Sequence, residues 1–192
     1  MQNPQFCFSL QSMDHAKLKL DELNRLSVDE FKTTTKVDIV FVLDNIRSAQ
    51  NIGSIFRTSD AFNIAAIHIN GISATPPNKE ILKTALGSTE SVYWRYYEQT
   101  IDSINDLKAN GYTIVSVEQT INSTKLHEFA PIKGNKYAFV MGNEVEGVDQ
   151  KVIDLSDVIL EIPQFGTKHS LNVSVSAGIV LWDVYQKLFL GR

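Results

Sequence analysis

Cysteine is nearly absent from this chain. Its 192 residues include only one, Cys7, which has no partner for a disulfide bond within the chain. A single cysteine between two phenylalanines is most simply a small apolar residue in a reducing compartment, so we assign Cys7 no catalytic role. The N-terminus also lacks the basic start and the small-residue cleavage site of a secretory signal. These absences predict a cytoplasmic protein.

Long apolar runs and an excess of positive charge are missing too. No apolar run approaches the length that spans a bilayer, so we expect no membrane segment. The 18 Lys and Arg residues are outnumbered by 22 Asp and Glu residues, which argues against a protein that coats nucleic acid nonspecifically. A local basic patch is still compatible with this balance.

Three common kinds of site have no signature in the sequence. Neither Gly-x-Gly-x-x-Gly nor Gly-x-x-x-x-Gly-Lys occurs, so a familiar phosphate-binding loop is not predicted. The Gly-x-Ser-x-Gly turn of many hydrolases is missing as well. The histidines have no metal-ligand spacing, so we expect no metal site; they are His15, His68, His127 and His169.

Short apolar runs alternate with amphipathic stretches along most of the chain. The runs are rich in β-branched residues and predict buried strands at residues 38–43, 65–69, 112–117, 137–141 and 158–162. Helices are predicted around residues 52–62, 101–107 and 149–155, and over residues 170–189 at the end. This order predicts an α/β fold, a mainly parallel sheet with helices on both faces, whose site lies beyond the carboxyl ends of the strands.

The first 36 residues are predicted to form an N-terminal arm with short helices. Leu18, Leu23 and Leu26 recur near helical spacing, and Ser27 with Glu30 forms a capping-box pattern. Residues 37–192 then form the main domain, which is long enough to build a compact core.

Polar residues follow three of the predicted strands. Asn51 and Arg57 come after the first strand, a turn with two glycines and two carboxylates spans 142–148, and a polar loop spans 161–172. Because the carboxyl ends of parallel strands share one edge, we expect Asn51, Arg57, Glu144, Ser170 and Asn172 to meet there. Each also has a plainer interpretation, as turn chemistry, a solvated charge or a helix cap.

The loop 161–172 is predicted to lead into a helix capped by Ser170. The free N–H groups of that helix end, near Ser170 and Asn172, would be able to hold an anion, a carboxylate or a purine edge. Small residues from Ser174 to Gly178 allow another segment to approach closely. We also expect Asn51 to hold Arg57 by a side-chain hydrogen bond.

Together the three loops resemble the signature motifs of the SpoU-type (TrmH-like) RNA ribose 2′-O-methyltransferases of the SPOUT superfamily. The motifs read Asn45-x-Arg47-x-x-x-Asn51-x-Gly53-x-x-x-Arg57-Thr58, then Phe139-Val140-Met141-Gly142-Asn143-Glu144-x-x-Gly147, then Ile162-Pro163 through Gly166 to Ser170-Leu171-Asn172-Val173-Ser174-Val175. Their order and spacing match over about residues 37–189. Gln164 and Ser176 depart from the family's usual methionine and alanine, but neither is a motif residue.

The resemblance implies a C-terminal trefoil knot that binds S-adenosyl-L-methionine without a metal. The cofactor-binding positions would be Gly142, Asn143, Glu144, Gly147, Ile162, Leu171 and Asn172. The catalytic positions would be Arg57, Asn51, Glu144, Ser170 and Asn172. Contacts to RNA would come from Arg47, Arg57, Lys168 and His169, joined by Lys79, Lys83 and Arg95 if these face the same rim.

Arg57 is the residue that the resemblance offers for the chemistry. A ribose hydroxyl is a poor nucleophile at neutral pH, so the enzyme must assist its proton loss and align its oxygen with the methyl donor. Arg57 would either accept that proton or stabilise the developing alkoxide. We favour the electrostatic role because a guanidinium is nearly always protonated, and the identity of the base stays open.

Similar proteins are tight homodimers whose active site is completed across the interface. The apolar residues of the last helix suit such an interface and would equally suit an intrachain core. The chain shows no added N-terminal RNA-binding domain, which favours tRNA over rRNA as substrate. Two other functions remain open, a catalytically silent knotted RNA-binding protein and a nucleotide-binding α/β enzyme for ATP or NAD.

A run of aromatic residues lies near Arg95. Stacking on RNA bases is one interpretation of this run, but burial in the core or an interface is favoured because aromatic side chains are large apolar groups. The residues are Tyr93, Trp94, Tyr96 and Tyr97.

Overall fold

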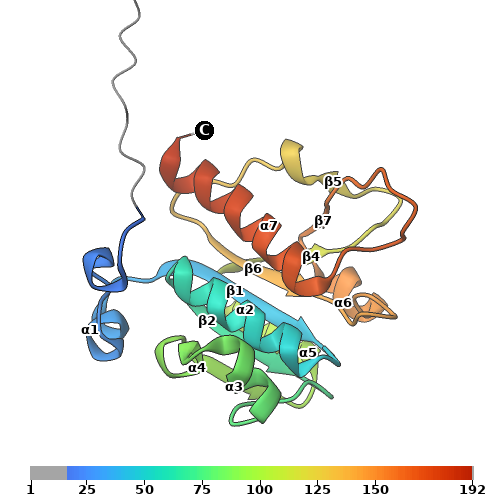
Figure 1. Cartoon of the computed structure of the whole chain (residues 1–192). Coiled ribbons are helices and arrows are strands. Elements are labelled where there is room, and N and C mark those ends of the chain that lie inside the picture. The colour runs from blue at the N-terminus through green and yellow to red at the C-terminus, as the bar shows by residue number, and fades with distance from the viewer. Residues whose placement is uncertain (1–16, 192) are drawn as a thin grey trace, which may run out of the picture.

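A seven-stranded sheet forms the centre of the computed structural model, which describes residues 17–191 (Figure 1). The strands lie in the order β3-β2-β1-β6-β4-β7-β5, and every neighbouring pair is parallel. They are β1 (Val37–Asp44), β2 (Ile64–Asn70), β3 (Trp94–Tyr97), β4 (Tyr112–Val117), β5 (Thr124–Lys125), β6 (Lys136–Met141) and β7 (Val158–Glu161). The predicted α/β fold with a parallel sheet is confirmed.

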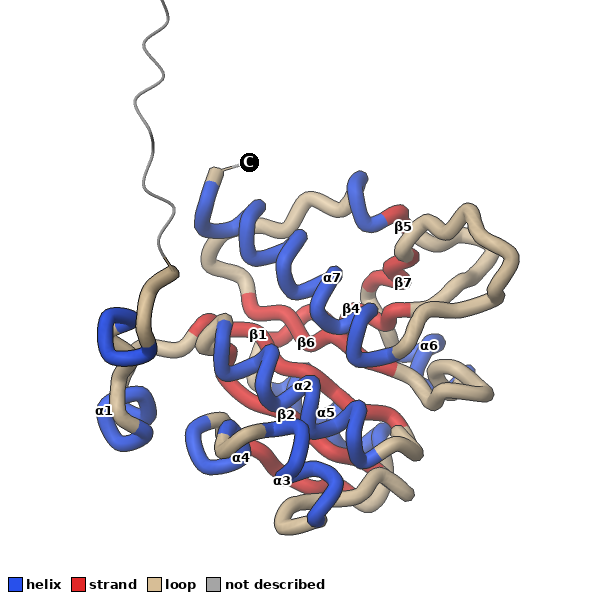
Figure 2. Tube along the Cα trace, viewed as in Figure 1, coloured by secondary structure: helices blue, strands red, loops and turns tan. Residues whose placement is uncertain are grey.

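Helices cover both faces of this sheet (Figure 2). One face carries α2 (Ala49–Ala61), α3 (Lys79–Ala85), α4 (Ser88–Ser91) and α7 (Val173–Tyr185), and the other carries α5 (Thr100–Ala109) and α6 (Gln150–Leu155). A 3-10 turn, η2 (Leu126–Glu128), follows β5, and a π-helical turn, η3 (Gln186–Leu190), extends α7.

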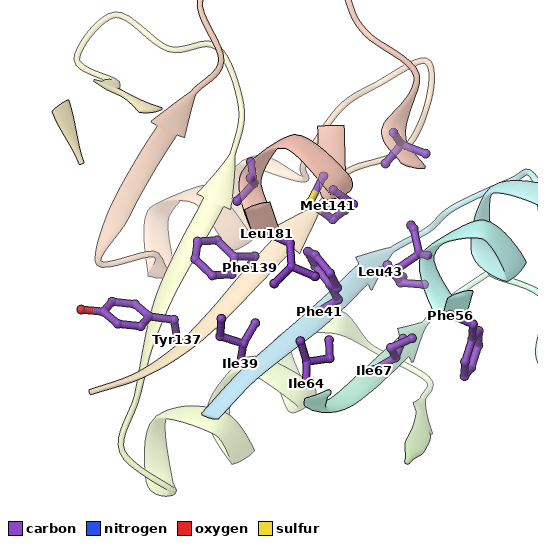
Figure 3. Packing of buried hydrophobic residues seen from close by; sticks show 14 of the residues in the cluster. Ile39, Phe41, Leu43, Phe56, Ile64, Ile67, Tyr137, Phe139, Met141 and Leu181 are labelled. Atoms are coloured by element: carbon purple, nitrogen blue, oxygen red, sulfur yellow. The ribbon is translucent and has the colours of Figure 1, made fainter. Parts of the chain in front are cut away.

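Strand β1 shows how the sequence divides between the two faces. Ile39, Phe41 and Leu43 belong to the core under α2 and α7, whereas Val40 and Val42 belong to the core under α5 and α6. Side chains alternate along a strand, so a strand buried on both faces needs the continuous apolar run found here. Figure 3 shows the first core, where the Phe41 ring lies 6.5 Å from that of Phe139 on neighbouring β6.

Four elements were missing from the sequence-based expectation. Strand β3 lies at the edge of the sheet and is half exposed, so it lacks a buried strand's apolar run, and β5 has only two residues. Helices α3 and α4 are short, with seven and four residues. Elements of this size take their stability from packing rather than from local sequence preference.

The described part of the arm contains a 3-10 turn, η1 (Leu20–Leu23), and a short helix, α1 (Val28–Thr33). The predicted capping box is confirmed: the Glu30 N–H donates to Ser27 Oγ at 3.3 Å, and the Ser27 N–H donates to Glu30 Oε2 at 2.9 Å. Cys7 and His15 lie outside the described residues. The proposed boundary at residue 36 stays a prediction.

The C-terminal segment passes a test for membrane-spanning length and composition, although Asp183 and Lys187 interrupt its apolar residues. Val173–Leu190 is one continuous helical segment of mean hydropathy 1.2, long and apolar enough by length and composition to cross a bilayer. Ala177, Val180, Leu181 and Val184 are buried in the core of the sheet domain. A core helix passes the same test, so this segment carries no inference about a membrane.

Strand β7 lies between β4 and β5. Since β5 belongs to the connection from β4 to β6, this connection continues to the far side of β7 before it returns to β6. Lys187, in η3, donates from Nζ to the main-chain oxygens of Leu126 and Phe129 in the same connection, at 2.8 and 2.9 Å. These contacts are consistent with the expected knot, whose crossing stays a prediction.

Candidate active site

A cavity of about 710 Å³ opens at the carboxyl ends of β4, β6 and β7. Four segments of the chain line it, namely the loop after β4, the turn after β6, the start of α6 and the loop from β7 into α7. All seven predicted cofactor positions line this cavity: Gly142, Asn143, Glu144, Gly147, Ile162, Leu171 and Asn172. The fold therefore brings the second and third motifs together, as expected.

Glu144 connects the second motif to the first. Its carboxylate accepts hydrogen bonds from the Arg47 N–H at 2.9 Å, the Ser48 N–H at 3.1 Å and Asn51 Nδ2 at 3.0 Å. Partial burial raises the pKa of this carboxyl, but the hydrogen bonds from Arg47, Asn51 and Ser48 outweigh it and hold the pKa below its usual value. Glu144 therefore stays ionised at neutral pH.

Asn172 connects the third motif to the first. Its Nδ2 donates to Asn51 Oδ1 at 3.1 Å, while its Oδ1 accepts from the Ser174 and Val175 N–H groups at 2.9 and 3.4 Å. Asn172 is thus the N-cap of α7. The expectation that Ser170 caps this helix is wrong: Ser170 lies in the preceding loop, where it lines the cavity.

Arg57 stands apart from this chain of hydrogen bonds. Six residues separate it from Asn51 on α2, which places it about 9 Å further along the helix and about 120° around it. Arg57 is exposed, does not line the cavity, and its side chain makes no hydrogen bond or ion pair within residues 17–191. The expected bond from Asn51 to Arg57 is wrong, because Asn51 uses its side chain on Glu144 and Asn172.

The turn after β6 is held tightly by its own backbone. Asn143 and Gly147 exchange two main-chain hydrogen bonds of 2.9 Å. A Cβ on Gly142 would lie 2.3 Å from the Gly147 carbonyl carbon, so only glycine fits against this turn. Gly147 itself has a φ of +75°, which favours glycine for conformational reasons as well.

Glu118 is a site residue that the sequence analysis missed. It follows β4 directly, lines the cavity, and accepts from the Val148 N–H at 3.0 Å and the Gln119 N–H at 2.8 Å. Its carboxylate thereby fixes the far end of the Gly142–Gly147 turn. A polar residue directly after the predicted strand 112–117 was the available signal, the same one that led to Glu144.

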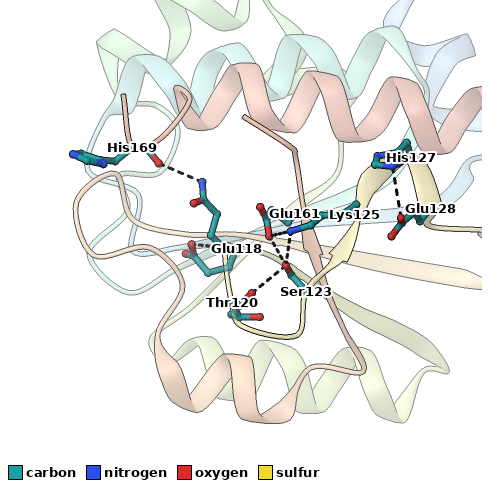
Figure 4. A network of polar contacts seen from close by, with 9 residues as sticks. Glu118, Thr120, Ser123, Lys125, His127, Glu128, Glu161 and His169 are labelled. Carbon is teal, nitrogen blue, oxygen red and sulfur yellow. Dashed lines mark hydrogen bonds and ion pairs between the residues drawn. The ribbon is translucent and has the colours of Figure 1, made fainter. Parts of the chain in front are cut away.

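A second polar cluster borders the cavity at β5 and β7 (Figure 4). Glu161, the last residue of β7, accepts from Lys125 Nζ at 2.5 Å and from Ser123 Oγ. The hydrogen bond from Lys125 is the largest cause that holds the pKa of Glu161 below its usual value, followed by the one from Ser123. Gln119 Nε2 also donates to the His169 main-chain oxygen at 3.3 Å, which joins the two loops that flank the cavity.

The expected RNA-contacting residues are exposed but lie at different places. Arg47 follows β1, and Lys168 and His169 lie in the loop before α7. Lys79 and Lys83 lie on α3, while Arg95 on β3 pairs with Asp106 at 3.4 Å. The aromatic run is divided: Tyr97 is buried and Trp94 half-buried, as favoured, whereas Tyr93 and Tyr96 are 65% and 45% exposed.

The two positions that depart from the family pattern, Gln164 and Ser176, both line the cavity.

Within residues 17–191 there is no group of three or more His, Cys, Asp or Glu side chains that could hold a metal ion.

The sequence matches the model of the SpoU rRNA Methylase family over residues 38–182, which includes all three loops described above. The chain belongs to this family.

Relatives of similar sequence include RNA methyltransferases. An uncharacterized tRNA/rRNA methyltransferase of Borreliella burgdorferi is 30% identical over 94% of this chain and 83% of its own length. The 23S rRNA (guanosine-2′-O-)-methyltransferase RlmB of Neisseria meningitidis is 31% identical over 84% of this chain, which spans 64% of RlmB, just under two thirds. The tRNA (guanosine(18)-2′-O)-methyltransferase of Thermus thermophilus is 28% identical over 86% of this chain and 84% of its own length.

Solved structures share the fold. The TrmH/SpoU tRNA modifying enzyme of A. aeolicus superposes with a TM-score of 0.73 at 24% identity, over 83% of this chain and 80% of that one. The AdoMet-bound rRNA methyltransferase of Sinorhizobium meliloti gives 0.73 at 24% identity, over 82% of this chain and 59% of that one.

Proposed function

We propose that this protein is an S-adenosyl-L-methionine-dependent RNA methyltransferase that methylates a ribose 2′-hydroxyl. The observation that carries the proposal is the chain of hydrogen bonds Asn172–Asn51–Glu144, which joins all three motif loops beside one cavity of about 710 Å³. Family membership and the activities named for RlmB and the Thermus enzyme support it. A tRNA is the favoured substrate and rRNA the alternative.

The cavity has the properties that the cofactor requires. Its volume falls within the range of small-molecule sites, about 300–1,000 Å³. Gly142 presents backbone without a side chain in the cavity wall, where it would contact an adenine edge, and the loop residues Ile162 and Leu171 provide apolar contact. When bound, S-adenosyl-L-methionine supplies an electrophilic methyl group. Glu118, Glu144 and Glu146 line the same cavity, and their negative charges complement the positive sulfonium of the methyl donor.

In this chain Asn51, Glu144 and Asn172 act as positioning residues. Glu144 fixes the start of α2 through two main-chain N–H groups, and Asn51 links that start to the cap of α7. Ser170 lines the cavity between them and is available to contact the ribose or the donor. Holding reactants in a fixed geometry is a large part of catalysis by group transfer.

Arg57 supplies the positive charge that the cavity of a single chain lacks. Arg57 is exposed on α2 and does not line the cavity, so we assign its guanidinium to the cleft of a second copy of the chain. There it would contact the phosphate beside the target ribose and stabilise the developing alkoxide. Arg47, Lys168 and His169 would contact further phosphates.

A homodimer with two-fold symmetry provides this arrangement. The outward face of α7 carries Val175, Ile179 and Trp182 at helical spacing, and these side chains are 51%, 37% and 49% exposed. Phe62, the residue after α2, lies beside Trp182, with ring centroids 6.1 Å apart, so the apolar face continues from α7 to the end of α2. Burial of this face against its own copy would bring the Arg57 side of one α2 toward the partner's cleft.

The test is incubation of the protein with labelled S-adenosyl-L-methionine and total RNA, followed by nucleoside mapping. We expect label in one 2′-O-methylnucleoside of the tRNA fraction. Label on a base would contradict the ribose assignment. RNA binding without any label would favour the catalytically silent alternative, and thermal stabilisation by ATP or NAD instead of the methyl donor would favour a nucleotide-binding enzyme. The expected cytoplasmic location stays a prediction.

A further inference from the structure

Two large apolar side chains beside the cavity are fully exposed. Phe165 is 98% exposed in the loop between β7 and α7, and Ile121 is 101% exposed in the connection after β4. Their preceding neighbours, Gln164 and Thr120, line the cavity, but Phe165 and Ile121 do not. Both apolar side chains therefore point out of the cofactor cavity and toward solvent. Figure 1 shows the orange-red loop before α7 projecting from the body of the fold.

The charge around these two side chains differs. The β7–α7 loop, residues 162–172, contains no Asp or Glu, and Lys168 and His169 are exposed three and four residues after Phe165. The segment 119–124 around Ile121 contains no charged residue, and Lys125, which follows it, is paired with Glu161. Only the phenylalanine therefore sits next to groups that attract a polyanion.

The position of Phe165 suits a contact close to the reacting ribose. Seven residues separate it from Asn172, a span of at most roughly 25 Å when fully extended. Gln119 also ties the second half of this loop to the cavity wall through the His169 main-chain oxygen. A base a few nucleotides from the target therefore lies within reach of the Phe165 ring.

We propose that Phe165 is a stacking platform for an unpaired base of the RNA substrate, with Lys168 and His169 contacting the adjoining phosphates. This inference rests on the proposed function and extends it to one residue of substrate recognition. Aromatic side chains stack on exposed bases of any sequence, because every base has an apolar face. A stacked ring beside basic residues would hold single-stranded RNA at the mouth of the cavity.

The experiment compares four variants of the full chain: Phe165→Ala, Phe165→Leu, Phe165→Trp and, as a matched control, Ile121→Ala. Bulk tRNA serves as the probe. Fluorescence anisotropy gives its Kd, and methyl transfer gives KM for tRNA and KM for S-adenosyl-L-methionine. We expect Phe165→Ala and Phe165→Leu to raise the Kd and KM for tRNA about tenfold, with Phe165→Trp near wild type, because stacking needs an aromatic ring. The KM for S-adenosyl-L-methionine should stay unchanged in all variants. The Ile121→Ala control should keep the wild-type Kd and KM for tRNA.

Several results would overturn the proposal. Equal Kd values for Phe165→Ala and the wild type would show that Phe165 does not contact the RNA. A wild-type Kd for Phe165→Leu would show that an apolar contact is enough and that stacking is not involved. Sedimentation showing that Phe165→Ala breaks a dimer would assign the ring to a second copy instead. A wild-type protein that binds tRNA but transfers no methyl group would refute the proposed function, while the anisotropy series would still decide the role of Phe165.

Discussion

The first and third turns of α2 differ in how their polar side chains are held. In the first turn, Asn51 is bonded on both sides, to Glu144 at 3.0 Å and to Asn172 at 3.1 Å. In the third turn, Arg57 is exposed and has no partner among the described residues. One helix thus carries a side chain fixed by contacts within the fold and another that has no partner among residues 17–191.

This difference indicates which functions one chain performs by itself. We propose that the contacts of the first turn shape the cavity for the methyl donor, since the hydrogen bonds that join Asn51, Glu144 and Asn172 all lie within the described fold. On the same proposal, Arg57 needs RNA, a second copy of the chain, or both before its charge acts on a substrate. Binding of the donor and transfer of the methyl group should therefore respond to different substitutions.

Arg57→Ala should have the largest effect. We expect kcat for methyl transfer to fall by about 10²–10³, the usual loss when a group that stabilises developing charge is removed. The Kd for S-adenosyl-L-methionine, measured by calorimetry, should stay within about twofold, because Arg57 does not line the cavity. Comparable turnover in this variant would remove Arg57 from the chemistry. Arg47→Ala, another exposed arginine at the rim, is the matched control and should mainly raise KM for RNA.

Ile179→Glu should separate the subunits. A carboxylate in the centre of the apolar face of α7 would be desolvated without a partner, so we expect a monomer in sedimentation velocity and a loss of methyl transfer of at least about tenfold. Ile121→Glu adds the same charge at an exposed apolar position away from α7 and should leave the assembly intact. A variant that is monomeric yet fully active would show that the cleft is complete within one chain.

Glu144→Gln should lower stability in a pH-dependent way. The pKa of Glu144 is depressed in the folded protein, so its carboxylate stabilises the rim above the unfolded pKa and loses that contribution as pH falls through the folded value. We expect the Tm difference between wild type and Glu144→Gln to be constant from pH 6 to 8 and to shrink below about pH 4. A difference that does not change with pH would indicate that charge is irrelevant here. Glu146→Gln, in the same turn, provides the comparison.

Asn172 variants should have the smallest effect and should separate its two contacts. Asn172→Asp keeps an oxygen for the N-cap of α7 but loses the donor to Asn51, whereas Asn172→Ala loses both. We expect Asn172→Ala to lower the free energy of unfolding by about 1 kcal/mol. Asn172→Asp should keep most of the stabilisation that the N-cap provides. Both variants should weaken methyl transfer. If Asn172→Asp transferred methyl groups at the wild-type rate, the link to Asn51 would have no role in positioning.

The sequence predicted the parts of the fold that have long, regular patterns. Five strands and the main helices follow from apolar runs and helical spacing, and the Ser27–Glu30 capping box follows from its spacing. Strand β3 and helices α3 and α4 were missed because they are short and depend on packing. The convergence of the three loops followed from one rule, that parallel strands share a carboxyl edge.

Side-chain partners could not be predicted in the same way. Ser170 and Asn172 are both good N-caps, and the choice between them depends on where the preceding loop leaves the sheet. Asn51 was expected to bond Arg57, but a helix separates residues six apart by about 120°. Glu118 was missed because its partner, the Val148 N–H, lies 30 residues away along the chain.

Mixing two inactive variants tests the shared cleft most directly. Arg57→Ala leaves the cavity intact, and Gly142→Ala damages the cavity but leaves Arg57 intact. After subunit exchange, half of the dimers are mixed and one of their two clefts is whole, so the account predicts recovery to about a quarter of wild-type methyl transfer. Mixed dimers that stay as inactive as either variant alone would contradict it, because Arg57 would then serve only the cavity of its own chain.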